Sequence, residues 1–180
     1  VLLKKQGFEV HGLYLDNADA KARQDAVETA EQLGVELRVL EIRGELEERV
    51  CRPFADCYLR GETPNPCVLC NSHIKWGVLL EQAKALGCEK IATGHYARIR
   101  TRNGHRYLAT AADTHKDQTY FLWMLTEENL AHTIFPLGDF TKEQVREMAR
   151  ERGHESLSHK RESQEICFIP DNDYRKFLTE

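Results

Sequence analysis

The stretch from residue 8 to residue 42 decides the fold. It consists of FEVHGLYL (8–15), DNADAKARQDAVETAEQLG (16–34) and VELRVLEI (35–42). The first and last pieces are rich in apolar side chains typical of strands. The middle piece carries apolar residues on one helical stripe from Asp19 to Leu33 and ends at Gly34. A strand–helix–strand order places parallel strands in one sheet, so we predict an α/β fold with a doubly wound parallel sheet.

The flanking segments continue this pattern. Val1 to Gln6 predicts the end of a helix, and Glu45 to Leu59 predicts another helix. A third short strand is expected from Lys90 to Thr93. Ligands of such folds gather beyond the carboxyl ends of the strands, where Leu15-Asp16-Asn17 and Gly94-His95 stand. Gly94 is a candidate for close approach of the backbone to a ligand.

A proline-rich stretch, TPNPCVLCN (63–71), follows the helix predicted from Glu45 to Leu59. Its two prolines are expected to exclude helix up to Pro66, and a helix is predicted from Ser72 to Leu86. Cys70 is therefore expected at or just before a helix N-terminus, where the macrodipole favours a thiolate. The alternative is a buried, inert cysteine in a turn.

The cysteines indicate chemistry inside a reducing compartment. The chain has six of them and no signal sequence, so we expect a cytoplasmic protein with free thiols. Cys67 and Cys70 form a C-x-x-C, which alone allows a redox pair, half a zinc site or iron–sulfur ligation. Cys167 stands in an apolar segment after a polar, basic loop. The remaining three are interpreted as packing residues: Cys51, Cys57 and Cys88.

The second half of the chain predicts a hairpin and then helices. Asn103-Gly104 is expected to close a hairpin within residues 97–111, because both positions tolerate positive φ. Helices are expected at 119–125 and 141–149, a mobile polar loop at 154–164 and a strand at 166–169. We divide the chain into a nucleotide-binding α/β domain, 1–112, and a mostly helical segment, 113–180.

Charge and hydropathy limit the possible partners. The net charge is −4, so contact with nucleic acid requires local patches. Two patches are candidates for such contact or for ordinary solvated surface: Arg98, Arg100, Arg102 and Arg106, and separately His159-Lys160-Arg161. No apolar run approaches the length of a membrane span, so we expect no membrane partner.

Four motifs in order point to one family. They are the 63–71 stretch, Ala92-Thr93-Gly94-His95-Tyr96, Lys116-Asp117-Gln118-Thr119-Tyr120-Phe121-Leu122 and Ile166-Cys167-Phe168-Ile169. The set resembles the tRNA-uridine 2-sulfurtransferases (tRNA-specific 2-thiouridylases), ATP-dependent enzymes that thiolate the wobble uridine of certain tRNAs. The resemblance covers essentially the whole chain. It implies an adenine nucleotide alpha hydrolase-like fold of the PP-loop ATP pyrophosphatase type.

The resemblance also implies roles for individual residues. Cys70 matches the family's first catalytic cysteine, and Cys167 matches the cysteine that carries the persulfide. Leu15 and Gly94 match positions that contact the nucleotide. Residues implied to contact the target base or the tRNA are Asn65, Pro66, Cys67, His95, Lys116, Asp117 and Gln118.

The implied reaction explains these residue types. Adenylation of the uridine C2 oxygen by ATP creates a good leaving group, with Mg²⁺ neutralising phosphate charge. A Cys167 persulfide then attacks C2, and Cys70 resolves the intermediate as a disulfide that an external reductant resets. The implied partners are tRNA and a persulfide-carrying sulfur-donor protein, and no DNA.

Two departures from the family pattern matter. The family's Ser-Gly-Gly-x-Asp-Ser phosphate loop is absent and is expected to precede Val1, while a C-terminal β-barrel region is expected beyond Glu180. We therefore expect a fragment that is inactive by itself. Cys67 stands where many members have an acidic residue, which leaves open a [4Fe–4S] cluster on Cys67, Cys70 and Cys167. Another PP-loop ATP pyrophosphatase, such as an amidating synthetase, and a metal-stapled tRNA-binding module are the competing interpretations.

Overall fold

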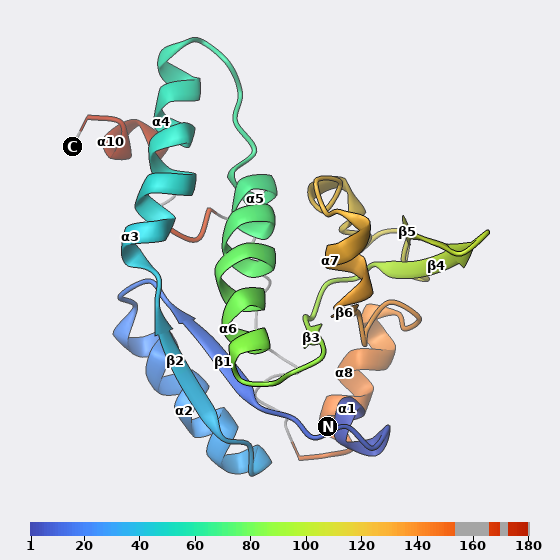
Figure 1. The fold of residues 1–180 in the computed structure, drawn as a ribbon. Helices are drawn as coiled ribbons and strands as arrows, with labels where there is room; N and C mark the ends of the chain where they lie inside the picture. Colours follow the sequence, from blue (N-terminus) through green and yellow to red (C-terminus); the bar gives the residue numbers. More distant parts are fainter. Residues whose placement is uncertain (154–165, 170–172, 180) are drawn as a thin grey trace. The chain divides into compact units, whose positions relative to one another are not determined.

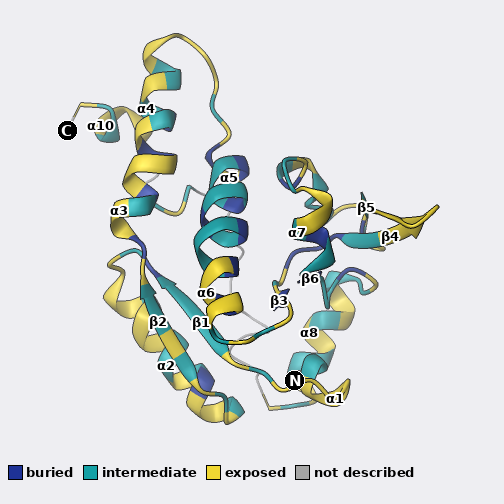
Figure 2. Ribbon diagram, viewed as in Figure 1, coloured by how far each residue is buried: buried dark blue, intermediate teal, exposed yellow. Residues whose placement is uncertain are grey.

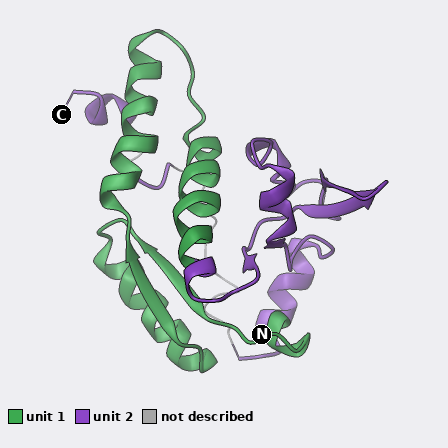
Figure 3. Ribbon diagram, in the orientation of Figure 1, with its two compact units in different colours: residues 1–82 green, residues 83–180 purple. Residues whose placement is uncertain are grey.

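The computed structural model describes residues 1–153, 166–169 and 173–179. These residues form two compact units, 1–82 and 83–180 (Figure 3). The functional division that we drew at residues 112 and 113 lies inside the second unit and stays a prediction.

The first unit begins with a strand–helix–strand arrangement. A short helix α1 (Leu2–Lys5) precedes β1 (Gly12–Asp16), α2 (Ala20–Leu33) and β2 (Leu37–Glu41). The strands pair in parallel, with Asp16 opposite Glu41 (Figure 1). As predicted, α2 follows Asp19, whose carboxylate accepts a hydrogen bond from the Ala22 amide at 2.9 Å, and it ends at Gly34 with φ of +57°. β1 starts later than expected, since Phe8 is exposed and unpaired with β2.

Two continuous helical segments follow, and the second of them ends in the second unit, after Gln82. One runs through α3 (Arg43–Leu46), η1 (Glu47–Cys51) and α4 (Arg52–Leu59), and the other through α5 (Pro66–Leu69), η2 (Cys70–Leu79) and α6 (Leu80–Ala85). Both η segments are π-helical, and they contact each other. Val50, Phe54 and Ile74 are fully buried in this core, and Figure 2 shows buried residues along both helical segments.

The second unit contains a parallel pair and a hairpin. β3 (Ile91–Ala92) pairs in parallel with β6 (Thr133–Ile134), and β4 (Arg98–Arg102) pairs antiparallel with β5 (His105–Ala109). Asn103 and Gly104 have φ of +53° and +80°, which confirms the predicted turn.

Short helices surround these strands. They are η3 (Thr119–Phe121), α7 (Glu127–Ala131), α8 (Lys142–Arg150) and α10 (Tyr174–Phe177). Thr141 and Gln144 form the predicted capping box of α8, and Thr126 and Asn129 form another on α7.

Two predicted elements are wrong. The expected helix at 119–125 is only the 3₁₀ turn η3, because the Asp117 carboxylate accepts from the Thr119 amide at 3.1 Å and competes with helical pairing. The expected strand at 166–169 is a turn in which the Ile169 amide donates to the Ile166 carbonyl at 2.9 Å. The predicted loop at 154–164 lies outside the described residues. No helix within the described part of the chain has the length and apolarity that crossing a membrane requires.

Candidate active site

The C-x-x-C lies inside a helix that begins at Pro66 and not at Ser72 as predicted. Cys70 therefore lies about one turn after the start of the helix. Asn65 is the N-cap of α5 and Pro66 occupies its first turn. Proline is favoured there because its missing N–H would have no helical partner and its φ is already helical. The prolines therefore start the helix, and Cys70 does not stand at its N-terminus. Cys67 is the cysteine in the first turn.

At Cys70 the helix changes from α to π geometry. The Asn71 side chain spans this change: its Nδ2 donates to the Cys67 carbonyl oxygen at 2.9 Å. Asn71 is 2% exposed, and its Oδ1 has no hydrogen-bond partner within the described part of the chain. Cys67 is exposed and Cys70 is half-buried. Short π segments inside α-helices are frequent at functional sites, so this turn is the first part of the candidate site.

Substitutions of Asn71 separate its hydrogen bond from its burial. Asn71→Ala is expected to change the free energy of unfolding by no more than about 1 kcal/mol, because it removes one hydrogen bond and one unpaired oxygen together. Asn71→Asp should cost about 3 kcal/mol or more, because a carboxylate would be buried facing the Cys67 carbonyl. Urea-denaturation midpoints of both variants test this. Equal midpoints for the two variants would contradict it.

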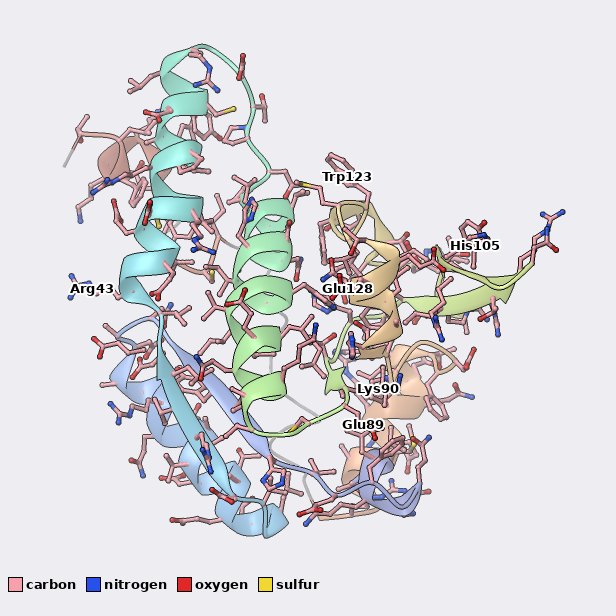
Figure 4. The ribbon with its side chains drawn as sticks, viewed as in Figure 1. Arg43, Glu89, Lys90, His105, Trp123 and Glu128 are labelled. Atoms are coloured by element: carbon pink, nitrogen blue, oxygen red, sulfur yellow. The ribbon has the colours of Figure 1, made fainter. Side chains whose placement is uncertain are left out.

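A cleft lies at the carboxyl ends of β1 and β2. Buried Asp16 accepts from the Ala18 amide at 2.8 Å, and its Oδ2 lies 3.3 Å from Nη1 of Arg23. Ala18 has φ of +74°, an uncommon conformation for a residue other than glycine. The cleft has a volume of about 370 Å³ and is lined by Asp16, Ala18, Arg23, Val39, Glu41 and Arg43 (Arg43 is labelled in Figure 4).

The sequence located this edge through Leu15 but did not single out Arg23. Leu15 is the half-buried residue directly before Asp16 on β1. Arg23 lies in the first turns of α2, and its spacing from the strand end carries no motif. Its ion pair with Asp16 was therefore visible only in the fold.

In the second unit, two of the predicted motifs form one structure. The Gln118 amide donates to the Tyr96 carbonyl at 2.9 Å, and the Tyr96 amide donates to Gln118 Oε1 at 2.9 Å. His95 is buried, with Nδ1 2.8 Å from Thr93 Oγ1 and its ring against Phe121. The segment after β3 is therefore joined to the segment around residue 118.

Hydrogen bonds to the Asp117 carboxylate fix the backbone on both sides of this segment. The carboxylate accepts from the amides of Ala111 at 2.7 Å and Thr119 at 3.1 Å, and from the Thr119 hydroxyl. Burial opposes its ionisation, but the hydrogen bonds from Thr119 and Ala111 prevail, so the pKa of Asp117 is lowered. Neighbouring Lys116 is half-buried. The structure thus gives Asp117 and Gln118 a supporting role whether or not either contacts tRNA.

The lowered pKa of Asp117 predicts a local pH dependence. Its stabilisation is present above the unfolded pKa of about 4 and is lost as pH falls through the lower folded value. Hydrogen-exchange protection of the Ala111 and Thr119 amides, normalised for intrinsic rates, should fall between pH 5 and pH 3 by up to about 1 kcal/mol. In Asp117→Asn this pH dependence should disappear, whereas the control Glu31→Gln should retain it. Identical profiles for wild type and Asp117→Asn would contradict the assignment.

Cys167 is displayed on the turn at 166–169. Its side chain is exposed, whereas the neighbouring Ile169 is 3% exposed and the Phe168 ring lies 5.4 Å from the Phe177 ring. The apolar neighbours anchor the turn and leave the cysteine at the surface. The turn exposes the Cys167 thiol at the surface, which is what we expected of the predicted strand.

The other cysteines fit packing roles. Cys51 is buried, and Cys57 and Cys88 are half-buried. Desolvation and a hydrogen bond to Glu62 raise the pKa of the Cys57 thiol, which disfavours its thiolate. Among the described residues, no group of three or more His, Cys, Asp or Glu side chains is arranged to hold a metal ion.

Comparison with known proteins identifies the family. The family model described as "tRNA methyl transferase HUP domain" matches residues 1–171. The chain belongs to this family, and the HUP domain confirms the predicted adenine nucleotide alpha hydrolase-like α/β fold.

Curated relatives cover the whole chain. The tRNA-specific 2-thiouridylase MnmA of Amoebophilus asiaticus is 47% identical over 99% of this chain, and that of Desulfitobacterium hafniense is 46% identical over 99%. The MnmA of Salinibacter ruber is 45% identical over 99%. The chain spans about half the length of these relatives, namely 51%, 52% and 51%.

Proposed function

We propose that this chain is part of an ATP-dependent tRNA-uridine 2-sulfurtransferase. The observation that carries the proposal is identity of 45–47% along nearly the entire chain to proteins named tRNA-specific 2-thiouridylases. The cysteines agree with it, since Cys70 starts a π segment beside buried Asn71 and Cys167 is exposed on an anchored turn.

The described residues fit a nucleotide only in part. Leu15 precedes the cleft at the end of β1, and at Gly94 a Cβ atom would meet only Leu137 Cδ1 at 3.8 Å. Packing of the described chain therefore does not require glycine at position 94, which favours a ligand as its reason. ATP would supply the AMP leaving group at the uridine C2 oxygen. No described cluster of ligands fits Mg²⁺, so we derive no step through it.

In the proposed reaction, Cys167 delivers the sulfur and Cys70 releases the product. The terminal sulfur of a Cys167 persulfide attacks C2 as AMP leaves with the C2 oxygen, forming a Cys167–S–S–C2 linkage. The Cys70 thiolate attacks the Cys167 sulfur, the S–S electron pair leaves with the outer sulfur, and 2-thiouridine is released. A Cys70–Cys167 disulfide remains, and an external thiol reduces it. A persulfide-carrying protein reloads Cys167.

The remaining residues would position the RNA. We propose that Asn65, Pro66 and Cys67 contact the target base, and that His95 and the 116–118 segment contact the tRNA. His95, Asp117 and Gln118 also support the fold, so their effects on tRNA binding would be indirect in part. We propose a cytoplasmic location, where tRNA and reducing thiols are both available.

Nucleoside analysis of tRNA tests the proposal. The full-length protein, incubated with unmodified tRNA, ATP and a persulfide donor, should produce 2-thiouridine at the wobble position, detected by mass spectrometry. ATP consumption without 2-thiouridine would favour another PP-loop pyrophosphatase, and tRNA binding without either would favour a non-catalytic module.

The iron–sulfur alternative has its own test. Anaerobically purified protein should carry a broad iron–sulfur absorption band, lost in Cys67→Ala, if a [4Fe–4S] cluster acts. Full thiolation by iron-free protein would exclude that mechanism.

A further inference from the structure

The β4–β5 hairpin has one strongly basic face. Residues on directly opposite positions of two antiparallel strands project from the same face of the ribbon. The register pairs Arg98 with Ala109, Arg100 with Tyr107, and Arg102 with His105. Three arginines, a tyrosine and a histidine therefore share one face. Arg106 lies on the opposite face, paired with Thr101.

This face is open to solvent. Arg100, Arg102, His105 and Tyr107 are all exposed, Tyr107 at 51%, and Figure 2 shows the exposed end of the hairpin. Figure 4 shows the His105 side chain projecting from the hairpin. Residues 98–109 contain four arginines and no acidic residue, in a chain whose net charge is −4. A positive surface of this density on an acidic chain indicates an anionic partner.

Acidic residues contact the hairpin both next to its turn and toward its open end. Glu127 of α7 accepts from the Arg106 amide at 3.1 Å, and its other carboxylate oxygen lies 3.1 Å from His105 Nδ1. Asp139 lies 3.3 Å from Arg98 and 3.8 Å from Arg100, so one carboxylate faces two guanidinium groups. The three arginines of the face outnumber its two acidic partners, so the face keeps an excess of positive charge. The contacts of Glu127 and Asp139 also fix the position of the hairpin.

We propose that the exposed part of this face, formed by Arg100, Arg102 and Tyr107, is a docking surface for the sugar–phosphate backbone of RNA. Arginines on alternate residues of a strand stand about 7 Å apart, close to the separation of successive phosphates along an extended strand. Arg guanidinium groups bind phosphate oxygens in bidentate fashion, and exposed Tyr107 offers a ring on which an unpaired base stacks. The inference rests on the proposed function, which supplies tRNA as the RNA, and adds a contact surface to the residues named there.

Binding of a tRNA transcript by the full-length protein tests the surface. Arg100→Ala/Arg102→Ala should weaken Kd about tenfold at low salt and reduce the slope of log Kd against log[salt] by about 1 to 2. Tyr107→Ala should weaken Kd about fivefold or more, and Tyr107→Phe should stay within about twofold of wild type. The control is Arg106→Ala, which removes one positive charge, half of what the double variant removes, from the opposite face and should change Kd by less than about twofold. Thermal melting of each variant verifies that the hairpin substitutions leave the protein folded.

The outcomes separate this inference from the proposed function. If wild type binds tRNA and the double variant binds it equally well, or if Arg106→Ala weakens binding as much as the double variant, the docking face is overturned and the proposed function stands. If wild type neither binds nor thiolates tRNA, the proposed function fails first. Unchanged tRNA affinity with lost sulfur transfer from a donor protein would assign the face to a protein and overturn the RNA surface.

Discussion

Cys167→Ser is expected to reduce 2-thiouridine formation by at least about 10³-fold while leaving the protein folded. Serine cannot carry a persulfide, so the nucleophile that attacks C2 is missing and no other group replaces it. The substitution should not destabilise the fold, because the Cys167 side chain is exposed and the turn is anchored by Ile169 and Phe168. Mass analysis of anticodon nucleosides measures the product, and a melting curve measures the fold.

The matched control is Cys88→Ser. Cys88 is half-buried in the turn after α6, and it is expected to keep activity within about threefold of wild type. Release of pyrophosphate from ATP should persist for about one turnover in Cys167→Ser, because adenylation of the uridine C2 oxygen precedes sulfur attack, whereas AMP leaves only when sulfur attacks C2. Normal thiolation by Cys167→Ser would contradict the proposed mechanism, and loss of folding would assign Cys167 a structural role instead.

The features that sequence predicted well are those decided by adjacent residues. Asn103-Gly104 sets two positive φ values by itself, and Thr141 with Gln144 closes a capping box within one turn. The parallel pairing of β1 with β2 follows from the connecting helix α2. In each case the deciding interactions lie within a few residues or one connection.

The predicted elements that are wrong lie where the local sequence is compatible with two different structures. Proline disfavours helix before itself but also begins helices, and Asn65 as N-cap starts α5 at Pro66, ahead of the predicted start at Ser72. Apolar residues at 166–169 fit a strand, but no strand among the described residues pairs with them, and a turn satisfies the Ile169 amide instead.

The sequence predicted which motifs contribute to the candidate site. It did not predict the contacts between the residues of these motifs. The two hydrogen bonds between Tyr96 and Gln118 join residues 22 positions apart, and no local pattern indicates them. The π geometry from Cys70 to Leu79 is likewise not indicated by the sequence, which is an ordinary helical pattern. Placing Cys70 relative to the helix start therefore required the structure.

Cys70→Ser is expected to stop the reaction after sulfur attack and before release. Without the Cys70 thiolate nothing within the proposed relay breaks the bond between the Cys167 sulfur and the outer sulfur, so the RNA stays attached as Cys167–S–S–C2. With protein preloaded with persulfide and no added thiol, the variant should accumulate one covalent RNA per protein, visible on a non-reducing gel. Released 2-thiouridine should fall at least about 100-fold. Adding dithiothreitol should free the RNA as the 2-thiouridine product, because the added thiol takes the place of Cys70.

Cys67→Ser distinguishes the persulfide mechanism from the iron–sulfur mechanism. Cys67 lies one turn before Cys70 on the same helix and is exposed, so the two substitutions alter the same segment in the same way. In the persulfide mechanism Cys67 holds no sulfur, and Cys67→Ser should lower product formation by less than about tenfold and form no adduct. In an iron–sulfur mechanism both variants lose a cluster ligand, and both should lose activity equally without any thiol-sensitive adduct. Free product from Cys70→Ser in the absence of thiol would contradict both assignments, because it would show that sulfur transfer proceeds without this cysteine.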